Sequence, residues 1–257
     1  MSAQPPQPNL LWQFEYSNVD SVTGLSPLAS NNSTISYNSS GKYNSSIVTN
    51  TNNAAGAPAS YLQYSLAALP SITVTCWIKP FSVSLASNQI VWGISDSTGT
   101  VGNWLQFIVI NSIIYVYGQN PAGGTPLLVM ATGNTPVQNG VWYHTALTMS
   151  ASGAVYVYFN GVEMGPLQQY SGGTPTGVYM QLWSTWTASS LVVSSYTRVP
   201  GLISGAWCEY DDLRVFSSVL TSSQIHTIYA AGGMPNQVSL SGSGTSYMNG
   251  TGTITMN

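Results

Sequence analysis

The stretch that decides the fold is residues 140–162, GVWYHTALTMSASGAVYVYFNGV. Residues 142–149 and 155–159 are rich in β-branched and aromatic side chains, which predicts a strand in each. The second strand runs into Asn160-Gly161, the dipeptide favoured where a two-residue turn needs a positive φ at both positions. The stretch therefore predicts a β-hairpin that turns at Asn160-Gly161, the strongest local hairpin signal in the chain.

Strand signals recur along most of the chain. In residues 72–79, every second residue from Ile72 to Ile78 is apolar and faces one way, while Trp77 and Lys79 face the other. Further strands are expected at residues 10–16, 61–64, 89–95, 105–110, 113–117, 127–131, 178–183, 191–195 and 207–216. Many short strands separated by turns predict an all-β sandwich or jelly roll.

One helix and two polar ends complete the organisation. The helix is expected over residues 222–231, because Thr221 can cap it, Gln224 can close a capping box and Gly232 can end it. The Pro/Gln-rich residues 1–9 predict a flexible leader, and the Ser/Gly/Thr-rich residues 234–257 predict a tail. The domain is therefore expected to span residues 10–233.

Charge is scarce, and this limits the classes of function. Only 4% of the 257 residues are charged, with four Lys and Arg against seven Asp and Glu. Four cations cannot neutralise a phosphate backbone, so no nucleic-acid partner is expected, and no apolar run is long enough for membrane insertion. The first residues lack the features of a classical signal peptide. Cys76 and Cys208 are either two buried free thiols or one long-range disulfide.

Four segments, taken in order, resemble a known family. They are LWQFE with DSVTG at residues 11–24, ITVTCWIKP at 72–80, the stretch at 140–162, and YDDLRVF at 210–216 followed by Leu220-Thr221. Together, over residues 10–231, they resemble the laminin-G-like jelly roll of the concanavalin A-like lectin and glucanase superfamily. The resemblance implies an all-β jelly-roll β-sandwich of two antiparallel sheets with one short C-terminal helix. The Ser/Asn-rich composition is also similar to that of surface proteins of large DNA viruses.

Glucanase chemistry is not expected, although the superfamily includes it. Such enzymes need two carboxylates on one strand face to flank the glycosidic bond. Glu209-Tyr210-Asp211 begins this pattern, but the position of the further acid is taken by Leu213 and Arg214. The sequence therefore predicts a protein that is not an enzyme. The test lies in the placement of six carboxylates: Glu15, Asp96, Glu163, Glu209, Asp211 and Asp212.

The resemblance implies one structural calcium ion. Asp211 matches the closing-strand Asp that binds calcium in many members, and Glu15 or Asp20 would join it with carbonyl oxygens of the opening segment. The alternative is that Asp211 and Asp212 pair with Arg214 or meet water. Either arrangement concerns stability and does not imply catalysis.

Aromatic residues beside neutral polar ones suggest glycan binding, because sugar C–H faces stack on Trp and Tyr while amides and hydroxyls bond the sugar hydroxyls. Four aromatic residues in or beside candidate loops are the predicted glycan-binding residues: Trp183, Trp186, Tyr170 and Tyr179. Core packing is the alternative for each of them. Trp12, Trp77 and Trp142 are assigned to the fold itself.

These observations favour a non-catalytic, lectin-like or adhesion module that binds glycans on an external surface such as that of a virion. The alternative is a structural capsid or decoration protein that contacts other coat or surface proteins and recognises no sugar. Low charge suits this alternative, because few charges must be desolvated when apolar faces pack. A glycoside hydrolase is the third possibility. An extracellular or virion-surface location is expected for either of the first two.

Overall fold

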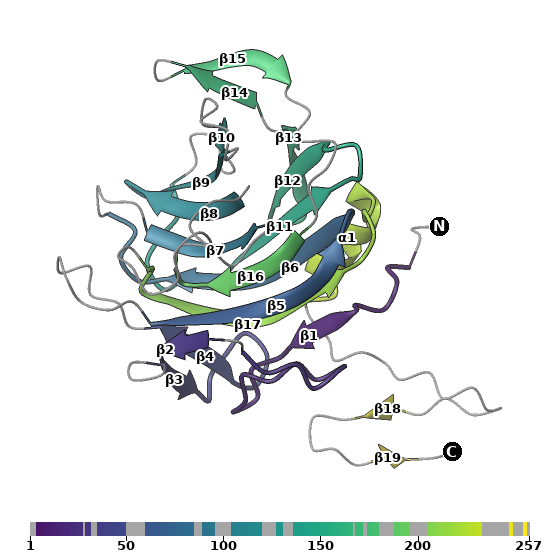
Figure 1. Cartoon of the computed structure of the whole chain (residues 1–257). Helices are drawn as coiled ribbons and strands as arrows, with labels where there is room; N and C mark the ends of the chain where they lie inside the picture. Colours follow the sequence, from purple (N-terminus) through teal and green to yellow (C-terminus); the bar gives the residue numbers. More distant parts are fainter. Residues whose placement is uncertain are drawn as a thin grey trace.

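Two packed β-sheets form the body of the protein, with one helix on the outside (Figure 1). The computed structural model describes residues 4–27, 29–31, 35–49, 60–84, 89–95, 104–119, 127–130, 136–166, 168–171, 174–179, 188–195, 205–232, 247–248 and 254–255. The predicted all-β jelly-roll sandwich of two antiparallel sheets with a short C-terminal helix is confirmed. A separate two-stranded pair, β18 (Tyr247–Met248) and β19 (Ile254–Thr255), lies near the C-terminus.

The first sheet has eight strands. Its order is β13 (Val162–Pro166), β12 (Val155–Phe159), β11 (Tyr143–Met149), β6 (Ile72–Pro80), β17 (Cys208–Phe216), β4 (Ser46–Thr49) and β3 (Ile35–Asn38), and β1 (Leu10–Trp12) also pairs with β17. The predicted hairpin joins β12 to β13 at Asn160 and Gly161, whose φ values are 49° and 76°. This sheet unites the first and last strands of the sandwich.

The second sheet has nine strands and carries no charge on any of them. Its order is β15 (Thr174–Tyr179), β14 (Gln168–Ser171), β10 (Leu127–Met130), β9 (Ile113–Gln119), β8 (Trp104–Ile110), β7 (Gln89–Ser95), β16 (Ala188–Val193), β5 (Tyr61–Leu69) and β2 (Ala29–Asn31). A tight turn at Asn111 and Ser112, both with a positive φ, connects β8 to β9. The described acidic and basic residues therefore lie in the first sheet and in segments outside the second.

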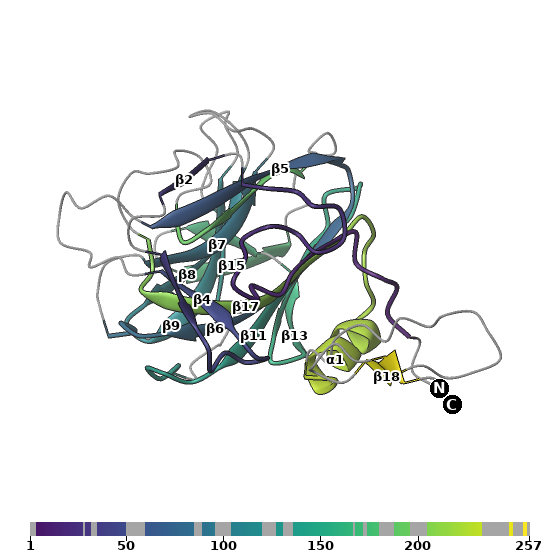
Figure 2. The same cartoon turned by 90° about the horizontal axis from the view of Figure 1, so that it is seen from below.

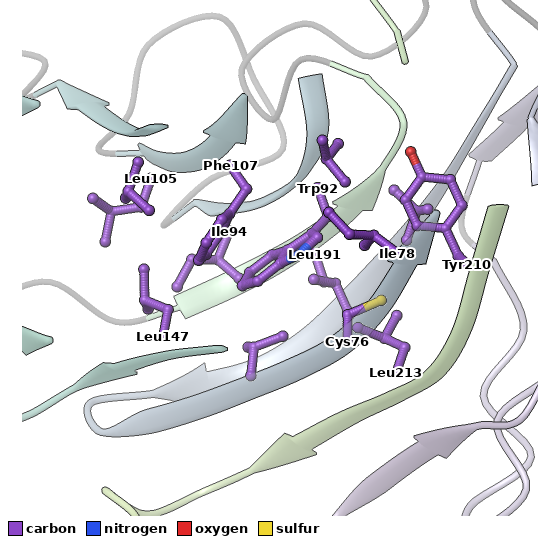
Figure 3. Packing of buried hydrophobic residues seen from close by; sticks show 14 of the residues in the cluster. Cys76, Ile78, Trp92, Ile94, Leu105, Phe107, Leu147, Leu191, Tyr210 and Leu213 are labelled. Carbon is purple, nitrogen blue, oxygen red and sulfur yellow. The ribbon is translucent and has the colours of Figure 1, made fainter. Parts of the chain in front are cut away.

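The hydrophobic core lies between the two sheets (Figure 3). Trp92 stacks on Phe107, with ring centroids 4.5 Å apart, and its Nε1 donates across the sandwich to Thr145 Oγ1 at 3.0 Å. Cys76 and Cys208 are buried free thiols, so the alternative without a disulfide is the one found. Burial and an inter-sheet hydrogen bond together fix how the sheets face each other.

Helix α1 (Ser222–Ala230) covers part of the outer face of the first sheet (Figure 2). It begins with the predicted capping box, in which Thr221 Oγ1 accepts from Gln224 N and Gln224 Oε1 accepts from Thr221 N. Its apolar residues Ile225 and Ile228 pack in one cluster with Leu220 and with the outward-facing strand residues Ala146, Tyr158 and Phe216. No helix within the described ranges has the length and apolar character needed to cross a membrane.

The described residues 4–9 of the N-terminal segment lie against the body of the domain. Asn9 N donates to Val215 O at 2.8 Å, and Asn9 Oδ1 accepts from Ser217 N at 2.6 Å. Gln4 O accepts from Gln224 Nε2 of α1 at 3.3 Å. These hydrogen bonds place residues 4–9 beside β17 and the helix.

Gly161 joins the hairpin to the helix and gives the first prediction. A Cβ there would lie 2.7 Å from Tyr229 Cδ1, whereas a Cβ at Gly140 would meet nothing within 4 Å, and both residues have a positive φ. We expect Gly140→Ala to cost about 1 kcal/mol of unfolding free energy, from the backbone conformation alone. Gly161→Ala should cost roughly 1–3 kcal/mol more, because Tyr229 must also move.

Urea unfolding of the two variants and the parent chain measures this difference. Equal losses in the two variants would show that the contact of Gly161 with Tyr229 does not constrain the helix.

Candidate functional site

The outer face of the first sheet is covered by α1 at one end and open at the other. Along β6 the outward residues are Thr73, Thr75, Trp77 and Lys79, opposite to the core residues Val74 and Cys76. Trp77 is only 4% exposed, because Lys42 lies over its ring at 4.1 Å and Tyr229 stacks on it at 5.7 Å. The open part of the face therefore starts at Lys79.

At this open end Lys79 lies beside the rings of Trp142 and Phe81, and Trp207 packs against Phe81. We call Trp142, Phe81, Trp207 and Lys79 the aromatic platform. Lys79 Nζ lies 4.9 Å from the ring centroid of Trp142 and 5.6 Å from that of Phe81. The rings of Phe81 and Trp207 are 5.5 Å apart, and Phe81 N donates to Trp207 O. Trp207 is 37% exposed, and Trp142 and Phe81 are half-buried. The platform thus offers aromatic surface to solvent on either side of one ammonium group.

Lys79 is held in place by a buried carboxylate. Its Nζ lies 2.5 Å from Glu209 Oε2, and the Glu209 side chain is fully buried while that of Lys79 is 15% exposed. Glu209 Oε1 accepts from Asn38 Nδ2 at 2.9 Å and from Ser46 Oγ at 2.5 Å. A buried carboxylate with these partners is stable only while the cation remains beside it. Lys79 is therefore a fixed part of the platform.

Asp211, the residue predicted to bind a metal ion, lies on β17 two residues after Glu209, under the loop that connects β3 to β4. Its Oδ2 accepts from Tyr43 N at 2.7 Å, and its Oδ1 accepts from Asp212 N at 2.7 Å. Burial above all, together with the carboxylates of Asp212 and Glu15, raises the pKa of Asp211 to about 8, although the two backbone donors lower it. Asp212 pairs with Arg214, Oδ1 to Nε at 2.9 Å, so only one of the two Asp residues takes the predicted arginine partner.

Glu15 and Asp20 occupy different environments. Glu15 Oε2 accepts from Ser45 N at 3.2 Å and from Ser45 Oγ at 2.8 Å, in the same loop whose Tyr43 N donates to Asp211. Asp20 is buried and accepts from the backbone N of Leu11, Val22 and Thr23 and from Thr23 Oγ1. Its carboxylate thereby closes the turn after β1.

The donor chemistry around Asp211 fits a hard cation. Asp211 and Glu15 supply carboxylate oxygens, and the buried Oδ2 of Asp212 has no hydrogen-bond partner. Asp20 fits less well, because four hydrogen bonds already engage its oxygens. Among the described residues, no group of three or more His, Cys, Asp or Glu side chains is placed to hold a metal ion. A cation here would therefore depend on carbonyl oxygens of the adjacent loop as well.

The predicted glycan-binding residues lie away from the platform or outside the described residues. Trp183 and Trp186 belong to the segment that the structure does not describe. Tyr170 lies on β14 and Tyr179 on β15, the paired strands at one end of the second sheet. Their role in glycan binding stays a prediction.

The sequence interpretation missed the platform, although the signal was present. Trp12 and Trp77 are buried as predicted, but Trp142, assigned with them to the fold, is half-buried beside Lys79. The alternation that points Trp77 and Lys79 away from the core, continued past Pro80, also points Phe81 outward. The same alternation in β17, continued back from Glu209, points Trp207 outward.

The described carboxylates offer no exposed acid pair on the sheets. Glu209, Asp211 and Asp212 on β17 are all buried, and they bond Lys79, backbone N–H groups and Arg214, whereas Asp212 Oδ2 has no hydrogen-bond partner. The strands of the second sheet contain no Asp or Glu at all. Asp96 lies outside the described residues.

Comparison with known proteins identifies the family. The family model for the concanavalin A-like lectin/glucanases superfamily matches residues 49–226. The chain belongs to this superfamily. No curated protein matches the chain. The resemblance to surface proteins of large DNA viruses stays a prediction.

Solved structures share the fold at low identity. Domain 4 of AbnA, an extracellular arabinanase from Geobacillus stearothermophilus solved with arabinotriose, has a TM-score of 0.62 and 18% identity over 88% of this chain and all of that one. The botulinum neurotoxin serotype G binding domain has a TM-score of 0.59 and 11% identity over 90% of this chain and 52% of that one. The serotype D domain in complex with N-acetylneuraminic acid gives 0.56 and 13% over 87% and 50%. At these identities the likeness shows the fold alone.

The raised pKa of Asp211 predicts how stability depends on pH in a metal-free buffer. The folded chain keeps this carboxyl protonated up to a pKa of about 8, whereas the unfolded chain releases the proton near the usual value of 3.8. The contribution of this carboxyl to the free energy of unfolding is thus fully present below about pH 4 and is lost as the pH rises through 8. We expect the melting temperature in chelator to fall from pH 5 to pH 8.

The neutral variant Asp211→Asn should flatten this fall, while the exposed carboxylate variant Glu163→Gln should keep it. A slope that is the same in Asp211→Asn and the parent would assign the pH dependence to other groups.

Proposed function

We propose that this chain is a non-catalytic, lectin-like module that binds glycans through the aromatic platform. This proposal rests on a cluster of three partly exposed aromatic rings, two of which lie directly beside one fixed ammonium group. Sugar rings stack their C–H faces on such rings, and an ammonium donates hydrogen bonds to their hydroxyls. Because Glu209 holds Lys79 in place, the donors are oriented before a ligand arrives.

The carboxylates support a binding role over a hydrolytic one. Glycoside hydrolysis needs two carboxyl groups that face the same bond from a groove. The described carboxylates of the sheets are buried, apart from the exposed Glu163, which contacts Ser222 of the helix, so no two of them face a groove together. The chain is therefore proposed to bind sugar without cleaving it.

The related structures agree with a glycan ligand. One is a domain solved with arabinotriose, and another is a toxin domain solved with N-acetylneuraminic acid. We extend this to display on an extracellular or virion surface, where many copies would turn weak single sites into firm attachment. Trp183, Trp186, Tyr170 and Tyr179 remain proposed glycan-binding residues in addition to the platform.

Replacing one platform ring tests the proposal. We expect Trp207→Ala to weaken glycan binding about tenfold or more, because a stacked ring contributes on the order of 1–2 kcal/mol. The matched control is Tyr156→Ala, since Tyr156 is 38% exposed on β12 and Trp207 is 37% exposed. A glycan array identifies the ligand, and calorimetry measures its affinity for each variant.

Binding that survives Trp207→Ala would place the glycan elsewhere on the domain. Absence of binding to every glycan, together with an assembly that persists at dilution, would favour the structural capsid or decoration protein. The uncharged second sheet suits that alternative, because its surface can pack against coat proteins without desolvating charges.

We also propose one structural calcium ion at Asp211 and Glu15. The ion would join the segment after β1, the loop between β3 and β4, and β17, so it would stabilise the native chain. At pH 8 we expect calcium to raise the melting temperature relative to chelator, and Asp211→Asn to abolish the rise. Asp20→Asn should lower the melting temperature but keep the rise, because Asp20 acts in the turn. A calcium response that survives Asp211→Asn would contradict this placement.

A further inference from the structure

We infer that the platform binds a neutral oligosaccharide of at least two residues, laid across β11, β6 and β17, and not a single terminal sugar. The inference rests on the proposed function, since it concerns the ligand of the same surface. It follows from the strands that carry the rings, from the residues that cover the neighbouring part of the sheet, and from the ion pair that balances the charge of Lys79.

The rings belong to three neighbouring strands. Trp142 directly precedes β11, Phe81 directly follows β6, and Trp207 directly precedes β17. Adjacent strands lie about 4.8 Å apart, so β11 and β17 are separated by roughly 10 Å. One pyranose ring cannot stack on rings at both sides of that span. A chain of two or more sugars can place one residue on Trp142 and another on Phe81 and Trp207.

The direction of the ligand is limited by the covered part of the sheet. Toward the helix, the next outward residue on β6 is Trp77, which lies under Lys42 and Tyr229 and is 4% exposed. A sugar chain therefore cannot continue along β6 in that direction. The aromatic surface continues sideways instead, from Trp142 past Lys79 to Trp207.

The charge balance favours a neutral sugar. Lys79 is the cation of the platform, and its charge is matched by Glu209 at 2.5 Å. The other described cations are engaged elsewhere, Lys42 over Trp77 and Arg214 with Asp212. An acidic sugar would have to draw Lys79 from Glu209 and leave a buried carboxylate unpaired. A neutral sugar needs only the remaining N–H donors of Lys79, which lie between the two aromatic stacking positions.

A length series of ligands tests this inference. Arabino-, manno- and cello-oligosaccharides of one to four residues are titrated calorimetrically, with oligogalacturonides as the acidic counterpart. For the neutral series that binds, we expect at least a tenfold gain in affinity between one and three residues. We expect the acidic oligomers to bind no more tightly than the neutral oligomers of the same length. Trp142→Ala should remove the gain with length, and Tyr156→Ala should keep it. Far-ultraviolet circular dichroism and the melting temperature confirm that each variant is folded.

The outcomes separate the inference from the proposed function. A monosaccharide that binds as tightly as the trimer, or an acidic oligomer that binds more tightly than the neutral one, overturns the inference and leaves glycan binding intact. Oligosaccharide binding that is unchanged in both Trp142→Ala and Trp207→Ala overturns the platform itself, and with it the inference.

Discussion

The ion pair between Lys79 and Glu209 is the interaction on which the open face of the first sheet depends. Glu209 on β17 also receives hydrogen bonds from Ser46 on β4 and Asn38 on β3, so one carboxylate links four strands. Because it is fully buried, loss of Lys79 would leave an uncompensated charge, which costs about 3–5 kcal/mol in comparable sites. The same pair positions the ammonium between the rings, so strand cohesion and the binding surface have one origin.

A β-bulge in β17 explains why the acidic cluster lies beside this pair. The pairing with β6 shifts register between Asp211 and Arg214, and Asp212 there adopts a left-handed φ of 48°. At the same point, the strand that pairs with the edge of β17 opposite to β6 changes from β4 to β1. Backbone donors of the bulge and of the loop after β3 are free of ladder bonds, so they can bond the Asp211 carboxylate. The left-handed conformation of Asp212 thus lies where β17, the last strand of the sandwich, begins to pair with β1, the first strand.

Alternation, the Asn-Gly turn and the capping box were sufficient to predict the sandwich and its helix, because each is a local signal that packing reinforces. The strands β3 and β4 were missed, since their Ser/Asn-rich residues form strands only by pairing with each other and with β17. The site could not be predicted in this way, because it depends on which residues lie over the outer face of the sheet, and those residues are distant in sequence. Trp77 and Trp142 both face outward from the first sheet, yet Lys42 and Tyr229 cover Trp77, while Trp142 keeps part of its ring open. Alternation predicts the face of a residue but not what lies over that face.

The distribution of charge determines how a ligand would be recognised. The second sheet is neutral on every strand, and the charges of the first sheet are mostly buried in pairs. Such a surface exerts little long-range attraction, so the encounter with a ligand is not electrostatically steered and affinity depends on close contact. Stacking on rings is short-ranged and tolerant of sugar identity, which limits the strength of one site. Firm attachment by this domain therefore requires either several sugars on one platform or several platforms on one surface.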